Sequence, residues 1–265
     1  MIPIRTTFEN VENKKEFSKD FFMNDFELEL KNANVKLDYF GMQMIIKQEH
    51  MEGLIKTIQT YLFNMIGIKI NNLNVKGYTN TDELPDYHSF RIRVQRCCGM
   101  DVKGFYNSID QTVYVRIGAH LKSLLPILFH ELTHAYIHQN NLKLVDDFPK
   151  PDVVCFDFAS MMYIADQEEG ICELVSSLMC YNIFDIDQYP SNVDEYWLGW
   201  RLSVQAFISF SEILINKFPN NDNIWVTKLA FQSILNHIKK TNNLYKFVQF
   251  VPKNEYHRTK SIFFN

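Results

Sequence analysis

The sequence predicts an α+β fold that is mostly helical, with a small mixed sheet and with a helix carrying two histidines packed against a helix carrying glutamates. Three observations lead to this prediction. Residues 130–134 read His-Glu-Leu-Thr-His within an apolar run that starts at Leu124, and apolar residues recur at helical spacing in most other segments. Between residues 73 and 117, short stretches alternate between apolar and polar residues, which is typical of strands in a small sheet.

Composition limits the class of protein. The chain has 265 residues, of which 46% are hydrophobic, enough to bury a large core. We expect an N-terminal helical region (1–70) packed on a main domain (71–265), or one continuous domain. The net charge of −4 argues against nucleic-acid binding. No stretch reaches the roughly 20 apolar residues of a membrane span, and the first residues lack the apolar part of a signal peptide.

We therefore expect a cytoplasmic protein with neither nucleic-acid nor membrane partners, unless a dedicated secretion system translocates it. The five cysteines contain no Cys-x-x-Cys pair, and we expect them to be reduced. The oligomeric state stays open.

The N-terminal half predicts helices followed by the sheet. The first 40 residues mix charged residues with phenylalanines and predict helices packed on the body. Residues 42–66 carry apolar side chains at helical spacing and are followed by Gly67, which predicts one long amphipathic helix. Three segments then show strand patterns, namely residues 73–75, 90–94 and 113–117.

The C-terminal half is predicted to be helical. Ser123 as a cap and Pro126 in the first turn predict a helix that runs to about residue 140 and contains the two histidines. Residues 146–157 include two prolines and predict a loop. Further helices are expected over residues 167–181 and 194–217, with one or two more in the last 45 residues.

The His-Glu-x-x-His segment predicts a metal site. Two histidines four residues apart share one face of a helix, so His130 and His134 can bind one ion while Glu131 projects toward the metal-bound water. A catalytic zinc usually has three protein ligands and one water, so a third residue is needed. His138 lies about 12 Å from His130 along the helix axis, too far to share the ion. We expect His138 to be a surface residue or a minor substrate contact.

The third ligand is predicted on the helix over residues 167–181. Glu169 and Glu173 are four residues apart and share a face, whereas Glu168 is expected to point elsewhere. We predict that Glu169 binds the metal and that Glu173 accepts the ring N–H of a zinc-bound histidine. Gly170 would allow the two helices to approach closely. The two glutamates could also exchange roles, or form the charged face of a solvated helix.

The order of strand, His-Glu-x-x-His helix and glutamate helix resembles the gluzincin metallopeptidases, in which a glutamate followed by glycine is the third zinc ligand. Residues 127–135, 168–172 and 196–201 are also similar to the peptidase domain of the plant DA1 family. This similarity covers roughly residues 100–215. The LIM and ubiquitin-interacting modules of that family have no counterpart here, so its ubiquitin-linked substrates do not transfer to this chain.

The resemblance implies a zincin-like fold and a zinc metallopeptidase that hydrolyses a protein or peptide substrate. Glu131 would take a proton from the zinc-activated water and deliver it to the leaving amine. Tyr196 or Arg201 would stabilise the oxyanion by resemblance. Because they are five residues apart, about 140° around a helix, both cannot face one point without a distortion. Core packing and a structural ion pair are the alternatives for these two residues.

The strand over residues 113–117, if it lies at the cleft edge, could pair with an extended substrate, with Tyr114 and Arg116 contributing specificity. Two other interpretations remain. The chain could be an inactive zincin-fold protein that serves as a protein-binding module, or a helical interaction protein in which the motif is coincidental. The presence of Glu131 favours the enzyme, because a scaffold has no physical need for a water-activating glutamate.

Overall fold

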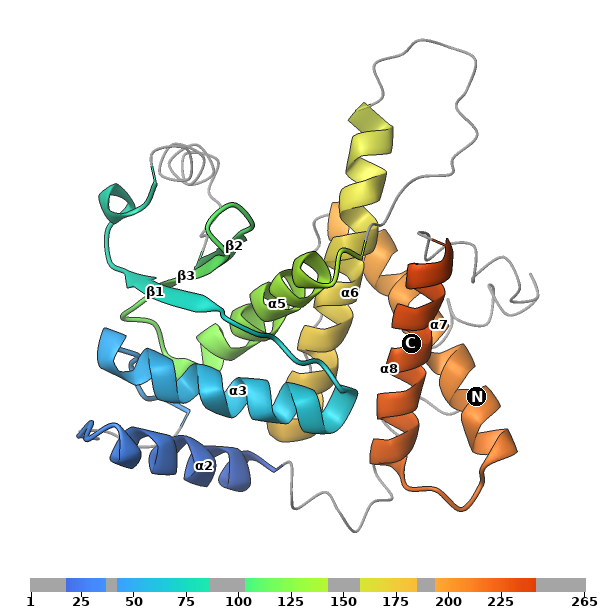
Figure 1. Cartoon of the computed structure of the whole chain (residues 1–265), viewed down its shortest axis with the longest axis horizontal. Coiled ribbons are helices and arrows are strands. Elements are labelled where there is room, and N and C mark those ends of the chain that lie inside the picture. The colour runs from blue at the N-terminus through green and yellow to red at the C-terminus, as the bar shows by residue number, and fades with distance from the viewer. Residues whose placement is uncertain (1–17, 37–41, 86–102, 143–157, 185–193, 242–265) are drawn as a thin grey trace.

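The computed structural model describes residues 18–36, 42–85, 103–142, 158–184 and 194–241. Within these ranges the fold is mostly helical with one small mixed sheet, as predicted (Figure 1). Side chains are described from Gln167 onward in α6, and at Trp200 and from Ser203 onward in α7. The longer helices are α2 (Lys19–Asn32), α3 (Met51–Ile66), α5 (Leu121–Gln139), α6 (Phe158–Phe184), α7 (Asp194–Lys217) and α8 (Asn223–Thr241).

The sheet contains β1 (Asn74–Tyr78), β2 (Gly104–Asn107) and β3 (Thr112–Arg116) in the order β1-β3-β2. β1 pairs with β3 in parallel, and β2 pairs with β3 antiparallel. Strands were predicted where β1 and β3 lie, but β2 was not predicted. The strand expected over residues 90–94 falls outside the described residues, as does the loop expected over residues 146–157.

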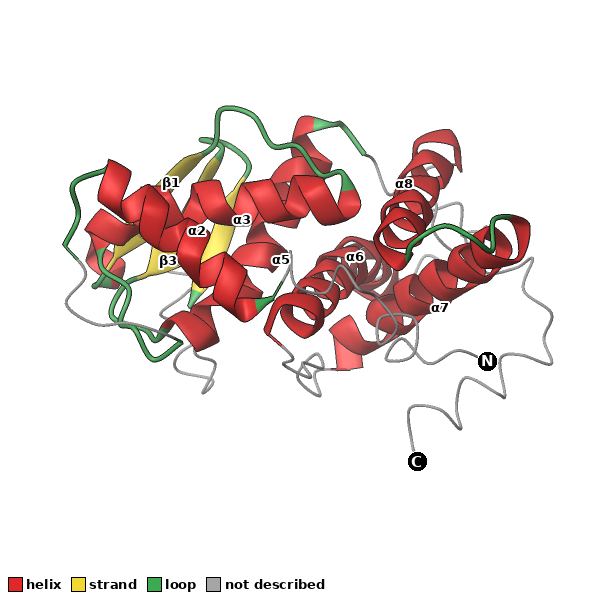
Figure 2. Ribbon diagram, turned by 90° about the horizontal axis from the view of Figure 1, so that it is seen from below, coloured by secondary structure: helices red, strands yellow, loops and turns green. Residues whose placement is uncertain are grey.

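Helix α6 lies between two parts of the molecule (Figure 1). The sheet with α2, α3 and α5 occupies one side of it, and the pair α7 and α8 the other; Figure 2 shows these at opposite ends. One buried hydrophobic cluster joins the two parts and includes residues from every longer helix. The core therefore contains residues from both sides of residue 70. None of the described helices is both long and apolar enough to cross a membrane.

The predicted starts of α5, α3 and α6 are wrong. The N-cap of α5 is His120, and the Ser123 hydroxyl lies inside the first turn, where it donates to the His120 carbonyl at 2.9 Å. The helix predicted over residues 42–66 begins as α3 at Met51, after a short 3₁₀ turn, η2 (Gln48–His50). Ile45, before this turn, forms a β-bridge with His120. Its neighbours Met44 and Ile46 are buried, whereas Ile45 itself is exposed.

The end of α3 and both ends of α7 agree with the sequence, whereas the start of α6 does not. α3 ends at Gly67, whose φ of 76° is left-handed and favours glycine. α7 has the predicted bounds, and α8 is one of the expected C-terminal helices. α6 starts about two and a half turns before the predicted residue 167, so the glutamates lie near its middle.

Candidate metal centre

Helices α5 and α6 pack against each other and carry all residues of the candidate centre. On α5, Leu128, Phe129 and Leu132 are fully buried, which orients the helix so that the two histidines lie at the edge of its buried face. The His130 and His134 side chains are each 14% exposed. They are thus shielded from bulk water but accessible from one side.

Three donor atoms converge between the helices. The Nε2 atoms of His130 and His134 are 3.1 Å apart. One carboxylate oxygen of Glu169, Oε2, lies 2.8 Å from the first and 3.4 Å from the second. Three ligands bound tetrahedrally at about 2.0–2.1 Å are roughly 3.3–3.4 Å from one another. The triangle therefore fits one small cation after a slight expansion.

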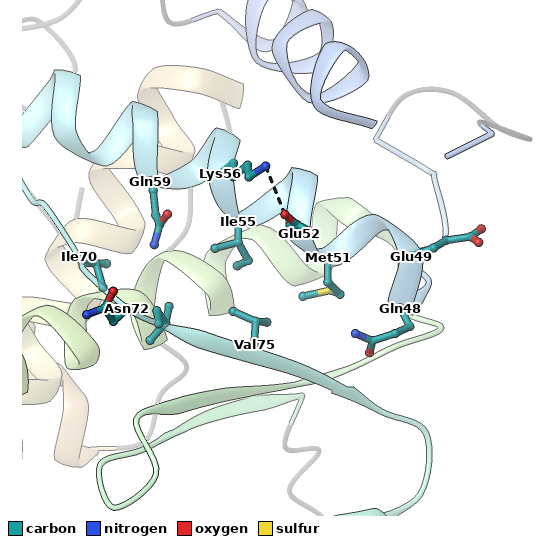
Figure 3. A pocket seen from close by; sticks show the side chains of 11 residues that line it. Gln48, Glu49, Met51, Glu52, Ile55, Lys56, Gln59, Ile70, Asn72 and Val75 are labelled. Atoms are coloured by element: carbon teal, nitrogen blue, oxygen red, sulfur yellow. Dashed lines mark ion pairs between the residues drawn. The ribbon is translucent and has the colours of Figure 1, made fainter. Parts of the chain in front are cut away.

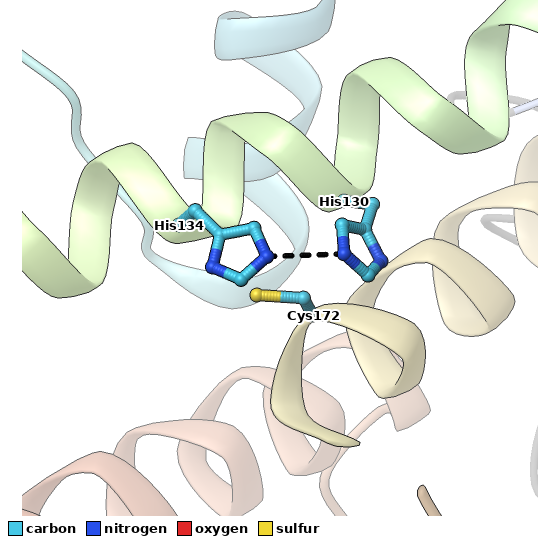
Figure 4. A group of neighbouring side chains, drawn as sticks. All are labelled: His130, His134 and Cys172. Carbon is cyan, nitrogen blue, oxygen red and sulfur yellow. Dashed lines mark hydrogen bonds between the residues drawn. The ribbon is translucent and has the colours of Figure 1, made fainter. Parts of the chain in front are cut away.

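Cys172 offers a further donor. It reaches from α6 toward His134 (Figure 4), and His130, His134 and Cys172 form a group that could hold a metal ion, with donor atoms within 4.8 Å of one another. Cys172 is fully buried. The two donor sets share both histidines and differ in the third residue, and the Glu169 oxygen lies close to both rings.

The outer ring nitrogens of both histidines also face carboxylates. His130 Nδ1 lies 3.2 Å from Glu173 Oε1, the position proposed for Glu173 from the sequence. His134 Nδ1 lies 2.7 Å from Glu168 Oε1. The expectation that Glu168 points elsewhere is therefore wrong. Because α6 packs along α5, a residue beside the shared face of Glu169 and Glu173 can still reach the second histidine.

The electrostatics of the group favour bound positive charge. Burial lowers the pKa of His130, but hydrogen bonds with Glu169 and Glu173 outweigh it and raise the pKa to about 9. Burial likewise lowers the pKa of His134, yet Cys172 and Glu169 raise it well above 6.5. Burial raises the pKa of Glu169, but the two histidines hold it far below its ordinary value. Without a metal, the group retains protons that a cation would replace.

Glu131 faces the sheet. Its Oε2 accepts the backbone N–H of Tyr106 in β2 at 2.7 Å. This contact needs β2 to lie close to α5, and Gly104 permits it: a Cβ there would lie 2.9 Å from Ile127 Cγ2 and 3.1 Å from the Tyr114 carbonyl oxygen. The glutamate next to His130 is thus held by the main chain of the strand.

Tyr106 is a residue that the sequence interpretation missed. Its hydroxyl lies 3.3 Å from His138 Nδ1, and the two rings meet edge to face with centroids 5.9 Å apart. Tyr106 carries no sequence signal beyond an aromatic residue two positions after a glycine. His138, predicted as a surface residue or minor substrate contact, is exposed and contacts this tyrosine.

Two further sequence expectations concern substrate binding. Tyr196 and Arg201 both lie on α7, but their side chains are outside the described part, so their proposed role stays a prediction. The condition that the strand over residues 113–117 lies at an edge is not met, because β3 pairs with β1 on one side and with β2 on the other. Tyr114 is 4% exposed and donates to Asp110 at 2.8 Å, which makes it a structural residue rather than a specificity residue.

A hollow of about 570 Å³ lies between α3 and β1 (Figure 3). An ion pair of 3.3 Å joins Glu52 and Lys56 at its wall. The lining contains no histidine and no cysteine, and none of the residues of the metal group. It offers no set of donors comparable with the centre between α5 and α6.

Comparisons with protein-family models, with curated proteins and with solved structures found no match. The function is therefore argued from the residues and geometry of the site.

Proposed function

We propose that the protein is a zinc-dependent metallopeptidase of the zincin-like, gluzincin type that hydrolyses peptide bonds of a protein substrate. The main support for the proposal is that His130 Nε2, His134 Nε2 and one Glu169 oxygen lie within 3.4 Å of one another. A bound zinc ion would polarise the scissile carbonyl and acidify a water molecule. His130, His134 and Glu169 would hold it.

The donor chemistry supports zinc. Two imidazoles and one carboxylate form a common catalytic zinc set that leaves a position open. Glu173 and Glu168 each face the outer nitrogen of one histidine, an arrangement that fixes the ring orientation and increases the basicity of the metal-binding nitrogen. Both histidines thus have a carboxylate at Nδ1 while Nε2 points into the centre.

Glu131 is the proposed general base. One of its oxygens accepts the Tyr106 N–H, which fixes the carboxylate plane and leaves its other oxygen to take a proton and pass it to the leaving amine. Because a backbone N–H holds the Glu131 carboxylate, its orientation should change little when a neighbouring side chain is replaced. Glu131 therefore combines the expected position in the motif with an anchored geometry.

An extended substrate would pair with β2. In an antiparallel pair, backbone groups point alternately toward and away from the partner strand. The Arg116 N–H donates to the Lys103 carbonyl at 2.7 Å, and Tyr106 N–H points to Glu131. The main-chain groups of Gly104 and Tyr106 therefore face away from β3. The Gly104 N–H and the carbonyls of Gly104 and Tyr106 on this edge could pair with an extended peptide, whereas the Tyr106 N–H stays with Glu131.

A second function has one observation in its favour. If Cys172 bound the metal together with both histidines and Glu169, four protein ligands would close the site, as in structural zinc centres. The protein would then be a catalytically inactive zincin-fold module that binds other proteins. The donor distances of up to 4.8 Å in the set with Cys172 make this the weaker alternative.

The deciding experiment measures zinc per chain by metal mass spectrometry in the wild type, Glu169→Ala and Cys172→Ser. We expect about one zinc in the wild type and in Cys172→Ser, and a marked loss in Glu169→Ala. Glu131→Gln should keep zinc and the Tyr106 contact but lose cleavage of unfolded casein. Zinc loss in Cys172→Ser, with no cleavage by the wild type, would instead support the closed module. A folded wild type that takes up no zinc would refute both.

A further inference from the structure

We propose that Tyr106 is a catalytic residue whose hydroxyl donates a hydrogen bond to the carbonyl oxygen of the peptide bond being cleaved, and that His138 positions this hydroxyl. The inference rests on the proposed peptidase function and names a group that the His-Glu-x-x-His motif does not supply.

Tyr106 is attached to α5 at two points. Its backbone N–H reaches Glu131 at 2.7 Å, and its hydroxyl reaches His138 at 3.3 Å. These two positions are seven residues apart, about 10.5 Å along the helix axis. His134, one of the histidines of the metal centre, lies between them on the same helix. The tyrosine side chain thus runs alongside the turn that presents His134.

The surroundings keep the phenol in its donor form. Burial raises the pKa of Tyr106, the charge of Asp110 raises it further, and the charge of Glu168 adds to the effect while that of His134 opposes it. The hydroxyl therefore keeps its proton.

The contact with His138 suits a positioning role. At 3.3 Å it is long for a hydrogen bond that involves a hydroxyl, so it can orient the phenol while competing only weakly with a substrate carbonyl for the hydroxyl proton. If His138 Nδ1 donates to the phenol oxygen, the hydroxyl proton remains available for a substrate carbonyl. An oxyanion next to the metal needs such a donor, and a single one typically contributes about 10²–10³-fold to turnover.

The test compares Tyr106→Phe with the matched control Tyr114→Phe. Both remove only a hydroxyl from neighbouring strands, and Tyr106→Phe keeps the backbone N–H that holds Glu131. The control hydroxyl instead contacts Asp110 in the turn between β2 and β3. We expect Tyr106→Phe to lower kcat for unfolded casein about 100-fold with KM and zinc content nearly unchanged, and Tyr114→Phe to retain wild-type kcat.

His138→Ala should lower kcat by a smaller factor, about tenfold, and should have no further effect in the Tyr106→Phe background, because it acts through the phenol. A second readout is the binding of a peptide hydroxamate, whose carbonyl would accept a hydrogen bond from the Tyr106 hydroxyl. We expect Tyr106→Phe to weaken it about tenfold.

Equal kcat and equal hydroxamate affinity in Tyr106→Phe and the wild type would overturn the inference, and so would a change in KM alone. These results leave the peptidase proposal intact if the wild type binds zinc and cleaves. A wild type that binds neither zinc nor the hydroxamate would overturn the peptidase function, and this inference with it.

Discussion

The two glutamates that face the outer nitrogens of the histidines should control zinc affinity without binding zinc. Replacing Glu173 or Glu168 by glutamine keeps the size of the side chain and one acceptor oxygen but removes the negative charge. A charge-assisted hydrogen bond is about twice as strong as a neutral one, and loss of such partners costs about 10–100-fold in metal affinity. We expect each glutamine variant to lie at the lower end of this range and to bind zinc about tenfold more weakly, a loss of about 1.4 kcal/mol.

The structure indicates that Glu168→Gln and Glu173→Gln should weaken zinc binding to a similar degree and independently of each other. Glu168 lies 2.7 Å from His134 Nδ1, whereas Glu173 lies 3.2 Å from His130 Nδ1. The Glu168 side chain is 40% exposed and the Glu173 side chain 24% exposed. Greater exposure screens the stronger contact. Because each glutamate contacts a different histidine, the free energies should add, and the double variant should bind zinc about 100-fold more weakly.

The assay is competition for zinc against a chromophoric chelator at fixed pH and ionic strength, which yields Kd for each variant. Glu52→Gln is the matched control, since this glutamate pairs with Lys56 on α3 and should leave Kd unchanged. Wild-type affinity in both single variants would refute the idea that these carboxylates support the histidines. A double variant no weaker than either single one would refute their independence.

Three further predictions concern stability and the strand. In the metal-free protein, the pKa of His130 is raised from 6.5 to about 9, so the folded state binds this proton more tightly than the unfolded state. The free energy of unfolding should be greatest below pH 6.5 and fall as the pH rises through about 9; urea titrations across this range should show the fall only without zinc, and a flat profile would contradict it. Leu128→Ala, at a fully buried position, should lower the free energy of unfolding by about 2–5 kcal/mol; a loss below about 1 kcal/mol in urea unfolding would mean that α5 is loosely packed there. Gly104→Ala places a Cβ 2.9 Å from Ile127, which should cost about 1–3 kcal/mol and reduce casein cleavage more than zinc content, because β2 moves away from Glu131. Equal losses of zinc and activity would show that the strand also supports the metal group.

The sequence predicted which segments are helical because their apolar periodicity is local, although it misplaced the starts of α3 and α6. α7 has the predicted bounds, and the four-residue spacings of the histidines and of Glu169 and Glu173 bring their donors to one place. These relations depend only on the geometry of single helices. The start of α5 was misplaced, since Ser123 has the chemistry of a cap but donates instead to the His120 carbonyl.

The missed features depend on how elements meet. β2 has only four residues and lacks a clear alternation, so its existence follows from pairing with β3 rather than from its own pattern. Tyr106 could not be connected with α5 before that strand was placed. Glu168 was excluded because one helix face was considered alone, whereas its contact with His134 depends on how α6 packs on α5. Cysteine is a residue type that is often buried in the core, so nothing in the sequence connected Cys172 with the histidines. Only the packing of α6 on α5 brings it close to them.

The hydroxyl of Ser176 on α6 donates to the Pro126 carbonyl of α5 at 2.9 Å, and this is the carbonyl that the His130 amide reaches four residues later in a regular helix. The Ser176 hydrogen bond therefore fixes the position of α6 along α5, the two helices that carry the candidate metal donors. The orientation of Glu131 depends instead on its contact with β2. In the proposed peptidase, zinc would therefore be held by residues of α5 and α6, whereas the orientation of the general base would depend on the contact of Glu131 with β2. If the proposal holds, displacement of β2 would remove the hydrogen bond that orients Glu131 without removing a zinc ligand, and a measurement of zinc content would not detect the change.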